Sequence, residues 1–153
     1  MTLLRRINSL LAIVSLEWAL LMGRLIIAVI FWRSGQTKIE GFQLDPIRGE
    51  FLLDWPRLSD STVFLFQMEY QLPLIDPTVA AVLTAVAEHI FPLLIILGLF
   101  TRVSALSLLV MTGVIQIFVY PEAWVTHGLW AAILLMLLAQ GAGRLSIDRL
   151  LKL

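Results

Sequence analysis

Long apolar runs alternate with short polar stretches along most of the chain. A helix needs about 20 mostly apolar residues to cross a lipid bilayer. Runs of about this length occupy residues 16–33, 78–99, 103–120 and 124–141. The pattern therefore predicts an all-α integral membrane protein, in which four helices pack as a bundle and residues 1–153 form a single domain.

Two shorter stretches indicate helices at the membrane surface. Residues 3–14 place Arg5 and Arg6 among leucine and isoleucine, as in an amphipathic helix that lies in the interface. Residues 60–73 are strongly apolar, and we expect them to form a second surface helix that ends near a proline. Ser146 precedes the last short segment and is a candidate N-cap for a final helix.

The distribution of lysine and arginine predicts how the helices are oriented. Loops on the cytoplasmic side of a membrane are enriched in these residues. They occur before the first run, between the second and third runs, and after the fourth: Arg5, Arg6, Arg102, Arg144, Arg149 and Lys152. The long connection over residues 34–77 is instead more acidic than basic. We therefore expect both termini in the cytoplasm, residues 34–77 outside, and a bacterial cytoplasmic (inner) membrane location.

Composition supports the membrane class and excludes several functions. Of the 153 residues, 59% are hydrophobic and 14% are charged, whereas soluble domains have about 25% charged residues. The net charge is zero without a basic block, so nucleic acid is not expected as a partner. The absence of cysteine excludes disulfides and thiolate metal sites. The two histidines lack metal-ligand spacing and lie at different expected depths, so neither a metal site nor paired haem ligation is expected.

Two opposite charges fall inside the apolar runs. Arg24 lies near the middle of the first run and Glu88 near the middle of the second. A charge in hydrocarbon is costly unless it is paired or hydrated, and antiparallel helices bring their midpoints to one depth. We therefore predict an Arg24–Glu88 ion pair. Such a pair fits two interpretations equally: a purely structural contact, or part of a polar pocket that handles protons.

Residues beside Glu88 extend this candidate site. His89 follows it and points about 100° away around the helix, so it is either a second proton-handling group or a structural histidine. Pro92 removes a backbone donor and is expected to kink the helix and free the carbonyl of Glu88.

Further polar residues gather toward the external half of the predicted bundle. Lys38 and Arg33 lie at the end of the first run, Gln116 lies in the outer part of the third, and His127 lies at the outer end of the fourth. Each of these residues could also be an ordinary polar residue at a helix end, where such residues are common. Together they favour a cavity that opens to the outside, with walls from four helices and with residues 60–73 as a lid.

The chain resembles the DoxX family of small four-span bacterial membrane proteins. The resemblance rests on three blocks: GRLIIAVIFWRSGQTKI, with Arg24, Gly35 and Lys38; LPLIDPTVAAVLTAVAEHIFPLLIILGLFTRVSAL, with Glu88; and HGLWAAILLMLLAQGAGRLSIDRLL, with His127. The family is named after a subunit related to thiosulfate:quinone oxidoreductase. The resemblance therefore implies a membrane component of a quinone-linked redox system.

Three functions remain open from the sequence. In the first, the chain is a quinone-interacting subunit without a covalently bound cofactor, Glu88 and His89 exchange protons, and a redox partner protein delivers electrons. In the second, it is a structural or assembly subunit without catalysis. In the third, it binds or carries a small molecule, and a homo-oligomer would supply the half that a single four-span chain lacks.

Overall fold

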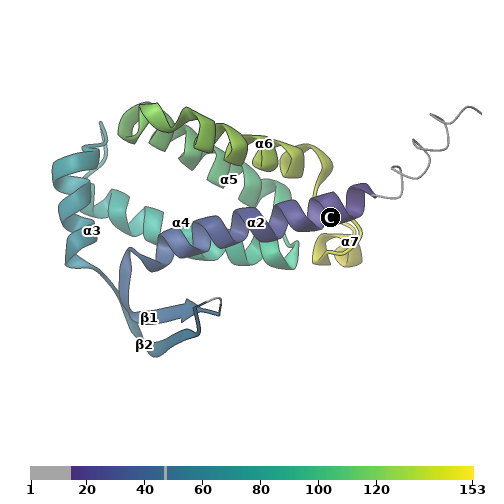
Figure 1. Ribbon diagram of the computed structural model, residues 1–153, viewed down its shortest axis with the longest axis horizontal. Helices are drawn as coiled ribbons and strands as arrows, with labels where there is room; N and C mark the ends of the chain where they lie inside the picture. Colours follow the sequence, from purple (N-terminus) through teal and green to yellow (C-terminus); the bar gives the residue numbers. More distant parts are fainter. Residues whose placement is uncertain (1–14, 47) are drawn as a thin grey trace, which may run out of the picture.

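The computed structural model describes residues 15–46 and 48–153 and is mostly helical (Figure 1). Its long helices are α2 (Leu16–Gln36), α4 (Pro77–Leu97), α5 (Thr101–Val114) and α6 (Trp124–Gln140). A π-helical turn, η2 (Ile115–Val119), continues α5, and a 3-10 turn, η3 (Pro121–Ala123), leads into α6. The predicted surface helix over residues 3–14 lies outside the described residues.

The long helices run along one axis and form a bundle (Figure 1). Each long helix packs against two others, in the cyclic order α2, α4, α5, α6 and back to α2. Helices α4 and α6 are therefore diagonally opposed. Side chains with almost no exposed surface fill the centre of the bundle: Leu20, Ile27, Phe31, Ile95, Leu108, Leu134 and Leu137.

The structure contains three helical segments that are long and apolar enough to cross a membrane, counted over the described residues. They are Pro77–Leu97, Thr101–Val119 and Pro121–Gln140. Each coincides with a predicted run to within three residues at either end. Helix α2 covers the first predicted run and continues to Gln36. Its role as a fourth span stays a prediction.

The helix ends follow from local sequence. Asp76 precedes Pro77, and its carboxylate accepts hydrogen bonds from the backbone of Thr78 and Val79 at 2.9 and 3.1 Å, which starts α4. Gly98 ends α4 with a positive φ of 65°, a conformation that glycine adopts without strain. The prediction for Ser146 is confirmed: its hydroxyl caps α7 (Ile147–Leu151) by accepting from the backbone of Arg149 at 3.2 Å.

The connection between α2 and α4 contains a β-hairpin, so the expectation of a wholly α-helical chain is wrong in this segment. Strands β1 (Ile39–Asp45) and β2 (Glu50–Leu58) pair antiparallel, with a bulge at Gly41. Helix α3 (Asp60–Leu65) and a π-helical turn, η1 (Phe66–Tyr70), follow. They lie across one end of the bundle (Figure 1), which is the arrangement expected of a surface helix in residues 60–73.

Candidate functional site: a cavity beneath the surface helix

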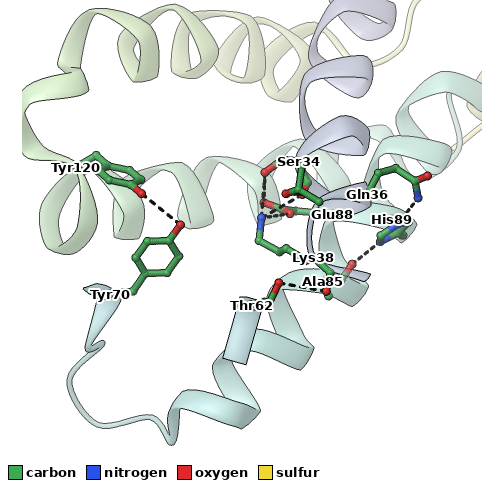
Figure 2. Close-up of polar contacts among 10 residues, drawn as sticks. Ser34, Gln36, Lys38, Thr62, Tyr70, Ala85, Glu88, His89 and Tyr120 are labelled. Atoms are coloured by element: carbon green, nitrogen blue, oxygen red, sulfur yellow. Dashed lines mark hydrogen bonds and ion pairs between the residues drawn. The ribbon is translucent and has the colours of Figure 1, made fainter. Parts of the chain in front are cut away.

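Glu88 lies within a compact polar cluster at the junction of α2 and α4 (Figure 2). The ammonium nitrogen of Lys38 is 2.7 Å from Glu88 Oε2. The hydroxyl of Ser34 donates to Glu88 Oε1 at 3.1 Å and accepts from Lys38 Nζ at 3.0 Å. The side chains of Glu88 and Lys38 are only 2% and 14% exposed. The carboxylate is therefore paired with an ammonium in a place that excludes most water.

The backbone that presents Lys38 is itself fixed. Lys38 follows α2 directly, and its backbone N–H donates to the carbonyl of Gly35 at 2.9 Å. Its carbonyl accepts from the Thr62 hydroxyl at 3.2 Å and from the Ser59 backbone N–H at 3.0 Å. These contacts join the start of β1 to α3. The ammonium is thus directed at α4 from a segment with little freedom.

Gly35 allows the two helices to approach at this point. A Cβ atom built on Gly35 would lie 2.8 Å from a ring carbon of His89 and 3.1 Å from Cβ of Glu88. Real Cβ atoms essentially never approach a neighbour below 3.0 Å. A larger residue would push α2 and α4 apart exactly where Ser34 and Lys38 reach the carboxylate, so Gly35 sets the geometry of the cluster.

The cluster faces a cavity of about 320 Å³. All four long helices contribute to its lining, together with η1, and Leu72 closes one side. Its other lining residues are mostly aromatic or aliphatic: Ile30, Phe31, Phe66, Tyr70, Met111, Val114, Ile115, Val119, Tyr120 and Trp130. Glu88, Lys38, Ser34, Thr84 and His127 supply the polar positions. The cavity is an apolar chamber with a few polar groups, which is the usual form of a small-molecule site.

His127 lines the cavity from α6, diagonally opposite the helix that carries Glu88. Gln116 determines which ring nitrogen of His127 carries the hydrogen. The Gln116 amide nitrogen donates to the Pro121 carbonyl at 2.7 Å, so its oxygen is directed at His127 Nδ1, also at 2.7 Å. Because an amide oxygen only accepts, Nδ1 carries the hydrogen. Nε2 of the neutral ring is then an acceptor, without a hydrogen-bond partner among the described residues.

Two tyrosines lie where the surface helix meets the end of α5. The Tyr120 hydroxyl is 3.3 Å from that of Tyr70 and 3.0 Å from a carboxylate oxygen of Glu69. The rings of Tyr70 and Tyr120 contact edge to face, with centroids 5.8 Å apart. Hydrogen bonding to Tyr70, burial and the Glu69 carboxylate raise the pKa of Tyr120, so its phenol stays protonated. These contacts hold η1 over the cavity.

A comparison with known proteins agrees with this architecture. The DoxX family model matches residues 19–121, which include α2, α4, α5 and most of the residues that line the cavity. The chain belongs to the DoxX family.

A curated protein of Haemophilus influenzae, described as an uncharacterized protein, is 38% identical over 74 residues. The aligned segment covers 43% of this chain, and the chain spans about half the length, 49%, of that relative. No solved structure matches the chain significantly.

The predicted Arg24–Glu88 pair is wrong for this DoxX chain. Arg24 instead donates to four backbone carbonyls: Ile95 at 2.8 Å, Ile96 at 2.6 Å, Ala142 at 3.0 Å and Leu145 at 2.6 Å. Helices α2 and α4 are antiparallel, but Ser34, not Arg24, lies opposite Glu88. Ten residues separate Ser34 and Arg24 along α2, which is about 15 Å. Arg24 is therefore at the other end of the bundle and outside the cavity.

Arg24 instead closes the bundle. Ile95 and Ile96 belong to the last turn of α4, where carbonyls run out of helical partners. The Ile95 carbonyl also accepts from the backbone N–H of Gly98 at 3.1 Å. The guanidinium donates to both carbonyls and joins them to the turn before α7. Gly98 leaves room for it, since a Cβ there would lie 2.7 Å from a guanidinium nitrogen.

His89 also lies outside the cavity, on the side of the Glu88 cluster away from Tyr70 and Tyr120 (Figure 2). Its Nδ1 donates to the Ala85 carbonyl at 2.7 Å, so Nε2 accepts from the Gln36 amide at 2.8 Å. The Gln36 oxygen accepts from the backbone of Leu44 at 2.6 Å. His89 is therefore a neutral ring with both nitrogens satisfied, and it connects α4 through Gln36 to the hairpin.

Sequence reasoning placed Lys38 in the pocket but did not identify it as the partner of Glu88. The signal was the separation of four residues between Ser34 and Lys38 at the end of α2, which puts both on one side of the helix end. Gln116 was predicted as a separate lining residue, whereas the structure places it behind His127 as the group that orients the ring. The tyrosine pair carried no local signal, because Tyr70 and Tyr120 are far apart in the sequence.

Proposed function

We propose that this DoxX protein is an integral membrane component of a quinone-linked oxidoreductase system and that the cavity beside Glu88 holds the quinone ring. The observation that carries the proposal is the apolar chamber with polar groups on two diagonally opposed walls. Lys38 and Ser34 stand at one wall with Glu88, and His127 stands at the other. A quinone ring is flat and apolar with a carbonyl oxygen at each of two opposite positions, so it suits such a chamber.

The proposal includes a four-span topology. Three helical segments can cross the bilayer by length and composition, and α2 packs along α4 in the same bundle. Arg24 is compatible with that depth because four carbonyls surround it. With both termini in the cytoplasm, the hairpin and α3 are external and residues 1–153 act as one domain in the bacterial inner membrane.

Lys38 and His127 have different roles at the two oxygen positions of the ring. When bound, a quinone supplies two-electron, two-proton redox chemistry. The Lys38 ammonium would donate to a ring oxygen in either oxidation state, in place of its long contact with the Ser34 carbonyl, 3.3 Å, while Glu88 would keep the ammonium in position. His127 Nε2 is an acceptor, so it would bond the other position only in the reduced form, where it would accept the hydrogen of a quinol hydroxyl. Neither role needs Arg24 or His89 to touch the ligand.

Electrons come from a partner protein in this proposal. The chain has no cysteine, so it cannot carry electrons through a dithiol of its own. The exposed hairpin offers an outer surface for such a partner, and a homo-oligomer would present two such surfaces.

The test is mass spectrometry of lipids that co-purify with gently solubilised protein. We expect bound quinone with the wild-type protein and no change with Glu40→Gln. Glu88→Gln removes the carboxylate that positions the Lys38 ammonium, and His127→Phe removes the acceptor for a quinol hydroxyl, so each variant should retain at least about tenfold less quinone and quinol together. Glu40 is a matched control, because its carboxylate pairs with Arg57 on the exposed hairpin.

Two results would overturn the proposal. One is quinone retention that is equal in all variants, which would place the quinone elsewhere. The other is the absence of quinone from every preparation together with a stoichiometric protein partner, which would make this a structural subunit. Circular dichroism of each variant ensures that a loss of quinone is not a loss of fold.

A further inference from the structure

A second cavity lies at the end of the bundle opposite the Glu88 cluster. Its volume is about 560 Å³, and polar side chains form much of its lining. Three arginines reach it from separate segments: Arg102 from the first turn of α5, Arg144 from the turn after α6, and Arg149 from α7. Elements distant in sequence therefore bring their positive charges to one hollow.

The acids in this cavity are already engaged by backbone N–H groups. Glu17 accepts from the backbone of Arg144 at 2.5 Å and lies 3.8 Å from the same residue's guanidinium. Asp148 accepts from the backbone of Phe100 at 2.7 Å and of Thr101 at 3.0 Å, at the start of α5. Among the described residues, neither carboxylate forms an ion pair with Arg102 or Arg149.

Arginine donors consequently remain available. The described residues give Arg102 one side-chain hydrogen bond, a long contact of 3.3 Å to the Ala139 carbonyl. They give the Arg149 side chain no hydrogen bond or ion pair. Each guanidinium has five N–H donors in a planar fork, so most of the donors that face this cavity lack an acceptor.

A buried hydroxyl at the same cavity also lacks a partner. Thr101 lines the cavity with a relative exposure of 0%, and its Oγ1 has no hydrogen bond among the described residues. Such a group costs free energy unless a ligand or water satisfies it. The Thr101 hydroxyl oxygen itself has almost no accessible surface, so it lies behind the wall of the cavity.

Exposed leucines lie in and just after α7, and one of them lines the cavity. Leu150, Leu151 and Leu153 are 80%, 59% and 70% exposed, and Leu153 lines the cavity. Exposed leucines beside arginines at the end of a membrane-spanning bundle suit the boundary between lipid head groups and acyl chains.

We infer that this cavity binds a phosphate group, which Arg102 and Arg149 hold through their free N–H donors. Phosphate oxygens match the planar fork of arginine, and charge-assisted bonds of this kind are the strong ones. The phosphate belongs either to an anionic phospholipid or to a free phosphate ion. This inference is independent of the proposed quinone site at the other end of the bundle.

The test is the melting temperature of the full chain in a neutral detergent, followed by intrinsic tryptophan fluorescence. Three probes are titrated: phosphatidylglycerol, phosphatidylcholine with the same acyl chains, and inorganic phosphate. The variants are Arg149→Gln, the double variant Arg102→Gln/Arg149→Gln, and Arg57→Gln. Arg57 is the matched control, because it is an exposed arginine on the hairpin at the other end of the bundle.

We expect phosphatidylglycerol to raise the melting temperature of the wild-type protein and of Arg57→Gln, and phosphatidylcholine to have no effect. The double variant should need at least about tenfold more phosphatidylglycerol for the same shift. The Arg149→Gln variant should need severalfold more, and it keeps the test valid if the double variant folds poorly, because its side chain has no internal partner.

Stabilisation by inorganic phosphate alone, with the same dependence on the arginines, supports the site with free phosphate as its ligand. Two results overturn the inference: no effect of either phosphate probe on the wild-type protein, or shifts that are equal in the wild-type protein and the double variant.

Discussion

The pairing of Lys38 with Glu88 can be tested by a double-mutant cycle. The variants are Lys38→Met, Glu88→Gln and the combination of both. The two atoms that pair are 2.7 Å apart, and both side chains are largely removed from water. If Lys38 is the partner of Glu88, the two substitutions must be strongly non-additive in their effect on the free energy of unfolding.

The magnitudes follow from the exposure of each side chain. Lys38→Met leaves a carboxylate that is 2% exposed without its ammonium, and breaking a buried pair in this way costs about 3–5 kcal/mol. Glu88→Gln should cost less, about 2 kcal/mol, because the Lys38 ammonium is 14% exposed and can turn toward water. The double variant leaves no unpaired charge and should lose no more than Lys38→Met alone. The expected coupling energy is therefore at least about 2 kcal/mol.

The assay is reversible unfolding in mixed micelles with increasing denaturing detergent, followed by circular dichroism. The exposed pair of Arg57 and Glu40 provides a parallel cycle at 3.3 Å, with side chains 76% and 51% exposed. That cycle should give a coupling of at most about 1 kcal/mol. If the Lys38 and Glu88 substitutions instead add to within about 0.5 kcal/mol, the pair does not stabilise the fold and the reasoning about its burial fails.

Two further predictions concern contacts that α2 makes with the rest of the bundle. Arg24→Met should destabilise the protein by about 3–5 kcal/mol, because it removes all four guanidinium hydrogen bonds and leaves the carbonyls of Ile96, Ala142 and Leu145 without this donor. Arg24→Lys should recover only part of this in the same unfolding assay, since one ammonium cannot reach four acceptors from two segments. Full recovery would contradict the assignment. Gly35→Ala should lower the free energy of unfolding by about 1–3 kcal/mol through overpacking against His89. Gly128→Ala is the control: nothing lies within 4 Å of the new Cβ, so it should be neutral or stabilising. Equal effects of the two alanines would show that α2 and α4 are not in close contact at Gly35.

The hydrophobic pattern predicted the long helices well, because each has an apolar run that must be buried or face lipid along its whole length. It placed the end of α2 too early. Residues 34–36 are polar or glycine, yet they remain helical because Ser34 and Gln36 have specific partners, Glu88 and Leu44. Partners supplied by distant segments leave no trace in a local pattern.

The hairpin was missed for a related reason. Strand β2 places Phe51, Leu52 and Leu53 in succession, and all are exposed, so no alternation of apolar and polar residues indicated a strand. What holds the hairpin is β1, whose Leu44 carbonyl accepts from the Trp32 indole at 2.8 Å.

The cavity was predictable as a region, because polar residues gather at one end of the helices, and Glu88, Lys38 and His127 do line it. The pairing within it was not predictable, because it depends on the register between α2 and α4. A shift of ten residues along α2 decides whether Arg24 or Ser34 faces Glu88. Composition and midpoint depth do not fix that register; the close approach at Gly35 does.

The carbonyls that hold Arg24 have a consequence for synthesis in the cell. They belong to residues 71, 72, 118 and 121 positions later in the chain. A ribosome makes α2 before α4 and the turn after α6, so if α2 crosses the bilayer as proposed, its guanidinium enters the membrane before any of these acceptors exists. An arginine at the centre of an inserting helix costs about 2.5–3.5 kcal/mol on translocon scales. Under that proposed topology, Arg24 gains its last acceptor only after the chain has been made as far as Leu145, and a protein truncated before that residue should retain α2 in the membrane less stably.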